Sequence, residues 1–336
     1  MHPESTRGVD RVPHGGCSDP SITDFSANVN PRTPPGVAGV YEGALAQSKR
    51  YPADDYARYR NAAGEYVGCP PGEVVPTPGG LAGIRLAIET VVDRGDSVLV
   101  PYPSFGEYAR EVRLQGAEVE FVPHDGLLDC DPGEHAMAVV CNPNNPTGTI
   151  YEADDLLEFL ARCRRADTVL LVDEAFLGFT DRPSMAGQAG AVVARSLTKL
   201  FGLPGLRAGF LVATGDLGER LELGRQAWNL GTPAAEVGAH CMGQREFVEA
   251  TRERVRTERA RMAERLEGHY DVTPSRAPFL LLDTGARSVD RVLDRVHEEE
   301  LTIRDARSFR GLDSHVRVAV RARRENDRLL DVLCDV

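Results

Sequence analysis

The chain is nearly free of lysine, and one of its two lysines lies in a motif suited to covalent chemistry. Of 39 basic side chains, only Lys49 and Lys199 are lysines. Lys199 ends the stretch Ser196-Leu197-Thr198-Lys199, close to Gly202. An amine can lose its proton and attack an aldehyde, whereas a guanidinium stays protonated. We therefore expect Lys199 to form a Schiff base, with a solvated surface lysine as the alternative.

Further polar residues follow short apolar runs of the sequence. The turn-rich segment Asn142-Pro143-Asn144-Asn145-Pro146-Thr147-Gly148 comes directly after the run at 137–141, and Asp173 ends the next run. A carboxylate at the end of a buried strand is costly unless a cation pairs with it, so a helix-capping or surface role explains Asp173 less well. Arg207 stands eight residues beyond Lys199. These residue types predict one crevice lined by amides, an acid and two cations.

Strands and helices alternate along the first two thirds of the chain. Helical periodicity is seen from 56 to 67, and a second helix begins at Gly79-Gly80 and ends before Gly95. This alternation is typical of an α/β fold with an open, mainly parallel sheet and helices on both faces. Such sheets bind ligands beyond the carboxyl ends of their strands. The expected strands are 97–100, 118–122, 137–141, 168–172, 191–194 and 209–213.

The chain is expected to divide into an arm and two domains. Residues 1–40 are rich in Pro, Gly and Asn and predict an extended arm that packs with the smaller domain. Residues 41–230 would form the large domain, and residues 231–336 a smaller α+β domain. The smaller domain is predicted from helices at 246–266 and 289–299 and from strands at 279–283, 301–305 and 316–320.

Composition narrows the possible partners. The 336 residues carry 51 acidic and 39 basic side chains, a net charge of -12, and 42% of them are hydrophobic. This composition is typical of a soluble globular protein and disfavours nucleic-acid binding, which needs a basic face. No apolar run reaches the ~18 residues that span a bilayer, and no secretory signal is seen, so we expect a cytoplasmic protein without membrane contact. The seven cysteines form no CxxC pair, which argues against disulfides and metal sites.

The same composition suggests adaptation to salt. An excess of Asp and Glu, arginine in place of lysine and few aromatic residues are typical of halophilic proteins. In ~1 M salt the Debye length is ~3 Å, so repulsion between surface carboxylates is screened. We therefore hypothesise that the fold needs salt.

Four motifs in order carry a resemblance to a known superfamily. They are NPNNPTG at 142–148, DEAF at 173–176, SLTK at 196–199 and GLRAGF at 205–210. Together they resemble the fold type I pyridoxal-phosphate enzymes, the aspartate aminotransferase superfamily. The resemblance implies pyridoxal 5′-phosphate bound covalently by Lys199, Asp173 at the pyridine nitrogen, Asn145 at the ring's 3-oxygen and Phe105 stacked on the ring.

The resemblance also assigns the cofactor phosphate and the assembly. Ser196, Arg207 and the backbone N–H groups of Gly80 and Leu81, at a helix N-terminus, would bind the phosphate. Tyr51 matches a tyrosine that reaches the phosphate of the neighbouring subunit in such enzymes. A homodimer with shared active sites is therefore expected.

Motifs near both ends of the chain resemble one family within this superfamily. These motifs are His14-Gly15-Gly16 and the segments 24–31, 303–305, 311–313 and 316–321, and Trp228-Asn229 between them adds to the match. They are similar to the threonine-phosphate decarboxylases of cobalamin biosynthesis, close relatives of histidinol-phosphate aminotransferases. Phe176 supports this, because aminotransferases commonly have a tyrosine there that bonds the ring's 3-oxygen.

The family resemblance implies a phosphorylated amino-acid substrate, L-threonine O-3-phosphate, which is converted to (R)-1-aminopropan-2-yl phosphate and CO2. Arg317 matches the arginine that forks the substrate carboxylate, a geometry that lysine reproduces poorly; a structural arginine at a strand end is the alternative. The candidates for the substrate phosphate are His14, Arg321 and Arg304, with help from Asn28 or Asn30.

Three other functions stay open at this point. The nearest is an aminotransferase acting on histidinol phosphate, with the same cofactor and fold. A second is a non-catalytic pyridoxal-phosphate-binding module of the kind fused to transcriptional regulators, although no helix-turn-helix segment precedes the arm. A third is a structural protein that reuses the fold without binding the cofactor.

Overall fold

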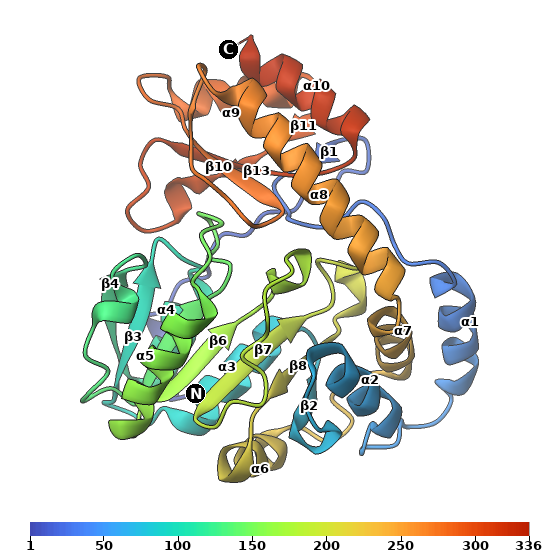
Figure 1. Cartoon of the computed structure of the whole chain (residues 1–336), viewed down its shortest axis with the longest axis vertical. Helices are drawn as coiled ribbons and strands as arrows, with labels where there is room; N and C mark the ends of the chain where they lie inside the picture. The colour runs from blue at the N-terminus through green and yellow to red at the C-terminus, as the bar shows by residue number, and fades with distance from the viewer. Residues whose placement is uncertain (336) are drawn as a thin grey trace.

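The computed structural model describes residues 1–335, which fold around a large sheet and a smaller C-terminal sheet (Figure 1). The large sheet has seven strands, and all of them run parallel except β8, which is antiparallel to both of its neighbours. In spatial order they are β2 (Val74–Thr77), β8 (Gly209–Val212), β7 (Ala191–Ser196), β6 (Val169–Asp173), β5 (Met137–Cys141), β3 (Ser97–Tyr102) and β4 (Glu118–Pro123). The parallel order brings the carboxyl ends of β3, β5, β6 and β7 to one edge of the sheet.

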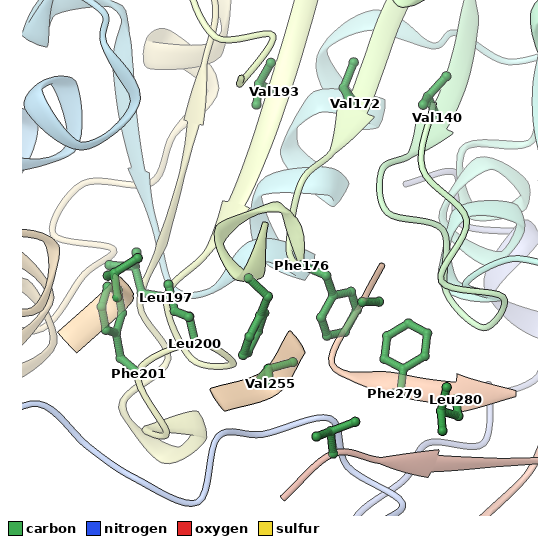
Figure 2. Close-up of a cluster of buried hydrophobic side chains, with 14 of the residues drawn as sticks. Val140, Val172, Phe176, Val193, Leu197, Leu200, Phe201, Val255, Phe279 and Leu280 are labelled. Carbon is green, nitrogen blue, oxygen red and sulfur yellow. The ribbon is translucent and has the colours of Figure 1, made fainter. Parts of the chain in front are cut away.

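The central strands are apolar along their length because helices cover both faces of the sheet. Val140, Val172 and Val193 lie side by side on adjacent strands in Figure 2, and they belong to the core on one face. That core is closed by α2 (Ala57–Val67), α5 (Ala153–Arg165) and α7 (Thr232–Met242). Val139 and Val192, one residue away along their strands, belong to the opposite core. The opposite core is closed by α3 (Gly80–Val91), α4 (Glu107–Gln115) and α6 (Gly215–Gly224).

The C-terminal sheet is antiparallel and lies above the large sheet in Figure 1. Its strand order is β12 (Arg304–Asp305), β13 (His315–Ala319), β10 (Phe279–Asp283) and β9 (Asp271–Val272). The long helix α8 (Arg245–Leu266) runs from α7 towards this sheet, which also carries α9 (Val289–Glu298) and α10 (Arg323–Cys334). Phe176 and Phe279 meet edge to face, with 5.1 Å between their ring centroids, where the two sheets approach each other (Figure 2).

The N-terminal arm contacts both parts of the molecule. The backbone N–H of His2 donates to the carbonyl of Leu114 on α4, at 2.8 Å. Further along, β1 (Thr23–Asp24) pairs in parallel with β11 (Leu301–Thr302) of the C-terminal part. The arm gives way to α1 (Val37–Gln47), which packs on α7. The arm therefore runs past the opening between the two sheets.

The mainly parallel sheet with helices on both faces is confirmed, and three details differ from expectation. The strand β2 was not predicted, because it is short and contains Pro76, a residue tolerated at a sheet edge. The strand expected at 301–305 is two strands, β11 and β12, in different sheets. The helix α1 begins inside the segment expected to be an arm. The domain boundaries at 40 and 230 stay a prediction.

Two findings bear on possible partners. Within residues 1–335, no helix combines the length and apolar character needed to cross a membrane. The same part of the chain holds no group of three or more His, Cys, Asp or Glu side chains placed to bind a metal ion. The seven cysteines are free thiols.

Candidate active site

A cleft of about 320 Å³ lies at the carboxyl ends of the central strands, between the large sheet and the C-terminal sheet. The end of β6 supplies Asp173, and Lys199 follows β7 by three residues. The C-terminal sheet supplies Arg304 and Arg317, and the arm supplies His14. Of the expected site residues, the cleft brings together His14, Asn28, Gly80, Leu81, Phe105, Asn145, Asp173, Ser196, Lys199, Arg207, Arg304 and Arg317.

Lys199 is held in a turn that places its amine in a cationic environment. Its backbone carbonyl accepts from the N–H of Asn30 at 3.0 Å. Burial lowers the pKa of Lys199 to about 8, and the Arg317 and Arg207 guanidiniums act in the same direction. About one tenth of the amine is therefore unprotonated at pH 7, far more than for an ordinary lysine, which suits a nucleophile.

Asp173 is buried at the floor of the cleft and has two hydrogen-bond donors. Tyr108 Oη on α4 donates to Asp173 Oδ2 at 2.6 Å, and the backbone N–H of Ala175 donates to Oδ1 at 2.9 Å. Burial raises the pKa of Asp173, although both donors favour the charged form. Within residues 1–335, no lysine, arginine or histidine forms an ion pair with Asp173. A buried carboxylate of this kind is stabilised by a cation that enters the cleft.

An anion cradle lies at the N-terminus of α3. Gly79, the residue before this helix, has a φ of +98°, and a Cβ at this position would lie 2.7 Å from Arg207 Nη2. A Cβ on Gly80 would meet the Ser196 side chain at 3.2 Å. The absence of both side chains lets the backbone N–H groups, the Ser196 hydroxyl and the Arg207 guanidinium face one space. Thr198 adds a second hydroxyl, 2.9 Å from that of Ser196.

Two buried arginines from neighbouring strands line the other side of the cleft. Arg304 on β12 and Arg317 on β13 are directly opposite each other in the register of the sheet. Arg317 donates to Asn145 Oδ1 and to the carbonyl of Ser26, while its Nε has no partner in the described structure. Arg304 donates to the carbonyl of Pro13 at 2.6 Å and to Ser308 Oγ at 2.7 Å. Neither arginine forms an ion pair within residues 1–335.

The pKa values of both arginines reflect this arrangement. Burial lowers the pKa of Arg317 to about 9, with the charge of Arg304 acting in the same direction. Burial also lowers the pKa of Arg304. Two positive charges with neutral partners are costly in a buried site. The pair therefore favours a ligand that brings negative charge.

The arm forms the rim of the cleft. His14 Nε2 lies 2.8 Å from Oε1 of the buried Glu107, and its ring centroid is 5.8 Å from that of Phe105. Asn28 is also buried, and its Oδ1 has no hydrogen-bond partner among the described residues. These two side chains are free to offer further polar contacts to a ligand.

Three of the expected residues do not line this cleft. Tyr51 is 80% exposed and packs against Trp228 with tilted rings, 4.8 Å between their centroids. Asn30 donates to the carbonyl of Leu200 and accepts from Arg254, so its amide is already occupied. Arg321 donates to Glu325 at 2.7 Å and to the carbonyl of Asp24. Asn30 and Arg321 are thus engaged within the protein, and their part in substrate binding stays a prediction.

Several residues of the site were not found from the sequence. Tyr108 on α4 stands three residues beyond Phe105, and no local pattern signals its contact with Asp173, 65 positions away. Glu107, which holds His14, could not be paired with a residue 93 positions away by any local pattern. Thr198 was visible inside the SLTK motif, whereas Ser308 and Phe309 follow β12 and carry no motif.

Comparison with known proteins gives both the fold and the family. The family model for aminotransferase class I and II matches residues 21–333. Histidinol-phosphate aminotransferase 2 of Archaeoglobus fulgidus is 28% identical over 330 residues, 95% of this chain and 94% of its own. Threonine-phosphate decarboxylase of Salmonella typhimurium is 29% identical over 340 residues, 96% and 93% of the two chains. The crystal structure of L-threonine-O-3-phosphate decarboxylase from Porphyromonas gingivalis matches with a TM-score of 0.85 at 25% identity, covering 94% of this chain and 99% of that one.

Members of the matched family use pyridoxal 5′-phosphate, and the cleft has the residues to hold it. The cradle around Gly79 and Arg207 fits a phosphate, the unpaired carboxylate of Asp173 fits a protonated pyridine nitrogen, and the Lys199 amine fits an aldehyde. The chain therefore belongs to the aminotransferase class I and II family and has the fold type I architecture of its pyridoxal-phosphate enzymes.

Proposed function

We propose that this enzyme decarboxylates L-threonine O-3-phosphate to (R)-1-aminopropan-2-yl phosphate, a step of cobalamin biosynthesis. The observation that carries the proposal is the buried pair Arg304 and Arg317, which has only neutral partners. The substrate has a carboxylate and a phosphate, and so could neutralise both guanidiniums at once. Relatives named for this activity and for histidinol-phosphate transamination are similar over nearly the whole chain.

The cofactor contacts follow from the geometry of the cleft. When bound, pyridoxal phosphate supplies an electron sink for the bond that breaks at the substrate Cα. Asp173, oriented by Tyr108, would keep a proton on the pyridine nitrogen. Phe105 would pack on the ring, and Asn145 would donate from its Nδ2 to the 3-oxygen while its Oδ1 accepts from Arg317. The phosphate would be bound by Ser196, Arg207 and the N–H groups of Gly80 and Leu81.

The substrate contacts divide between the two arginines. Arg317 would bind the carboxylate, because its Nε is unpartnered and its guanidinium can form two parallel hydrogen bonds. Arg304 and His14 would bind the substrate phosphate, with the Asn28 Nδ2 group as a further donor. Lys199 would donate the proton that replaces CO2 at Cα. Whether CO2 or a proton is lost depends on which Cα bond these groups hold perpendicular to the cofactor ring.

The alternative is an aminotransferase for histidinol phosphate, which would use the same cradle and arginines. Phe176 favours decarboxylation, because aminotransferases commonly have a tyrosine at this position. The tyrosine hydroxyl bonds the ring's 3-oxygen, and phenylalanine has no hydroxyl. The Phe176 ring instead packs edge to face on Phe279 and is buried (Figure 2). This apolar wall would leave Asn145 as the single side-chain donor at that oxygen.

One experiment separates the two reactions. Purified enzyme loaded with pyridoxal phosphate is given threonine phosphate, and separately histidinol phosphate with 2-oxoglutarate. We expect CO2 release from the first substrate, with no conversion of the cofactor to its amine form. Stoichiometric glutamate formation in the second mixture, without CO2 release in the first, would establish the aminotransferase instead.

A homodimer with shared active sites is part of the proposal. Tyr51 lies outside the cleft of its own chain, and its ring forms an exposed aromatic pair with Trp228. Exposed aromatic side chains of this kind are common at protein interfaces. We propose that Tyr51 contacts the cofactor phosphate in the neighbouring subunit.

The pKa of Lys199 predicts how the apoenzyme takes up its cofactor. Since only the unprotonated amine attacks, the rate of covalent capture should rise about tenfold per pH unit below pH 8 and level off above it. Stopped-flow absorbance of the apoenzyme mixed with pyridoxal phosphate measures this rate. The Lys199→Ala apoenzyme is the control and should show no covalent phase. A rate that stays flat between pH 6 and 8 would contradict the prediction.

A further inference from the structure

A second hollow, of about 450 Å³, adjoins the cleft and is rich in arginine. Its lining includes Arg11, Arg110, Arg113 and Arg310, and we call this space the arginine hollow. Its wall shares five residues with the cleft: Val12, Pro13, Phe105, Gly106 and Ser308. The two spaces therefore lie on either side of the same short stretch of arm and of the loop that precedes α4.

The charge of this hollow is opposite to that of the whole chain. Arg11, Arg113 and Arg310 are exposed, and none of them forms an ion pair with a residue in 1–335. Arg110 is neutralised by Glu107 and Glu111 outside the hollow. Among the described lining residues, the acidic one is Asp10. The whole chain has a net charge of -12, so its composition does not account for a local cluster of unpaired cations.

Two of these arginines are held in place on one aromatic ring. The guanidinium carbon of Arg310 lies 4.2 Å from the ring centroid of Phe121, and that of Arg113 lies 5.6 Å from the same centroid. Arg310 also lies 5.8 Å from the ring of Tyr102. Stacking leaves the guanidinium N–H groups free at the edges, where they can donate to an anion. Both cations are thus ordered beside each other without a carboxylate between them.

We propose that the arginine hollow is the docking site where the phosphorylated substrate first binds before it enters the cleft. This rests on the proposed function, because it assumes a substrate with a phosphate group. A negatively charged protein repels such a substrate at long range, and a local positive cluster beside the entrance reverses that effect and speeds association. The shared wall places the hollow directly beside the cleft that contains Arg304 and His14.

The position of the two sites explains why both would be needed. Arg304 and Arg317 are buried and hydrogen-bonded, so they recognise the ligand only at contact distance. Arg11, Arg113 and Arg310 of the hollow are exposed, so their field extends into solvent for about one Debye length, ~10 Å in 0.1 M salt. The exposed arginines of the hollow would thus attract the substrate, and the buried arginines of the cleft would recognise it.

The test measures association rates of threonine phosphate with the cofactor-loaded full chain by stopped-flow absorbance. The variant Arg11→Gln/Arg113→Gln/Arg310→Gln should associate about tenfold more slowly than wild type at low ionic strength. The difference should vanish in ~1 M salt, where the Debye length is ~3 Å. The matched control Arg165→Gln/Arg291→Gln/Arg324→Gln removes the same charge from exposed positions outside both cavities and should slow association far less.

Two further measurements separate charge from packing. The variant Arg113→Lys/Arg310→Lys keeps the charge and should associate nearly as fast as wild type, even though lysine stacks differently on Phe121. Association of L-threonine, which lacks the phosphate, should be equal in all variants. A glutamine variant as fast as wild type, or a lysine variant as slow as the glutamine variant, would overturn the inference and leave the proposed function intact. If wild type bound neither threonine phosphate nor histidinol phosphate, the proposed function and this inference would both be overturned.

Discussion

Replacing Lys199 with alanine is expected to lower the turnover of threonine phosphate by about 10³- to 10⁴-fold, the upper range for loss of a general acid or base. The reason is specific to this side chain. No other lysine lies in the cleft, because the second lysine of the chain, Lys49, is not among its lining residues. The cleft also holds Arg207 and Arg317, but a guanidinium cannot replace an amine as nucleophile or proton donor.

Two controls separate loss of chemistry from loss of structure. Lys199→Arg restores the positive charge and should be as inactive as the alanine variant. The alanine variant should still bind the cofactor without a covalent bond, because the cradle at Gly80, Ser196 and Arg207 is unchanged. Its thermal midpoint should not fall, since removing Lys199 relieves repulsion from Arg317. Activity above one tenth of wild type would mean that another group holds the cofactor.

Arg317→Gln is expected to lower kcat/KM for threonine phosphate by about 30- to 4,000-fold. This range corresponds to about 2–5 kcal/mol, the cost of removing one member of a buried, hydrogen-bonded charge pair. Glutamine keeps a donor near Asn145 and Ser26 but loses the charge and the planar fork. Arg317→Lys keeps the charge without the fork, so we expect an intermediate effect. Steady-state kinetics with saturating cofactor measure both variants.

The control for this prediction is Arg324→Gln, at an exposed position outside the cleft. It should have nearly the wild-type kcat/KM. Arg317→Gln should still bind the cofactor covalently, seen as an absorbance band, because Lys199 and the cradle at Gly80, Ser196 and Arg207 are unchanged. A kcat/KM within threefold of wild type would remove Arg317 from substrate recognition and leave Arg304 as the main anion-binding residue.

The cofactor side of the cleft could be predicted from the sequence because its residues follow the ends of consecutive parallel strands. Asn145, Asp173 and Ser196 come just after or at the ends of β5, β6 and β7, and the sheet brings these ends to one edge. Apolar runs locate such strands well. Local spacing was therefore sufficient to expect these side chains in one crevice.

The substrate side depends on contacts that local spacing does not encode. Arg304 and Arg317 meet only because β12 and β13 pair in one register, and the strand at 301–305 had been expected as a single element. Asn30 and Arg321 stand in motif-like segments, yet their side chains form hydrogen bonds within the protein. Asn30 bonds Leu200 and Arg254, and Arg321 bonds Glu325. The salt requirement stays a prediction, because it depends on the solution around the surface charges.

The arginine pair also links the conformational stability of the protein to the anions around it. With the cleft empty, Arg304 and Arg317 raise the free energy of the native state, because their charges are desolvated and face each other. Any dianion that binds the native state alone adds stability, by about 2.7 kcal/mol at a concentration of one hundred times its Kd. Inorganic phosphate or sulfate in the medium would thus act as a folding ligand, and the resistance of this enzyme to heat becomes a property of the buffer as well as of the chain.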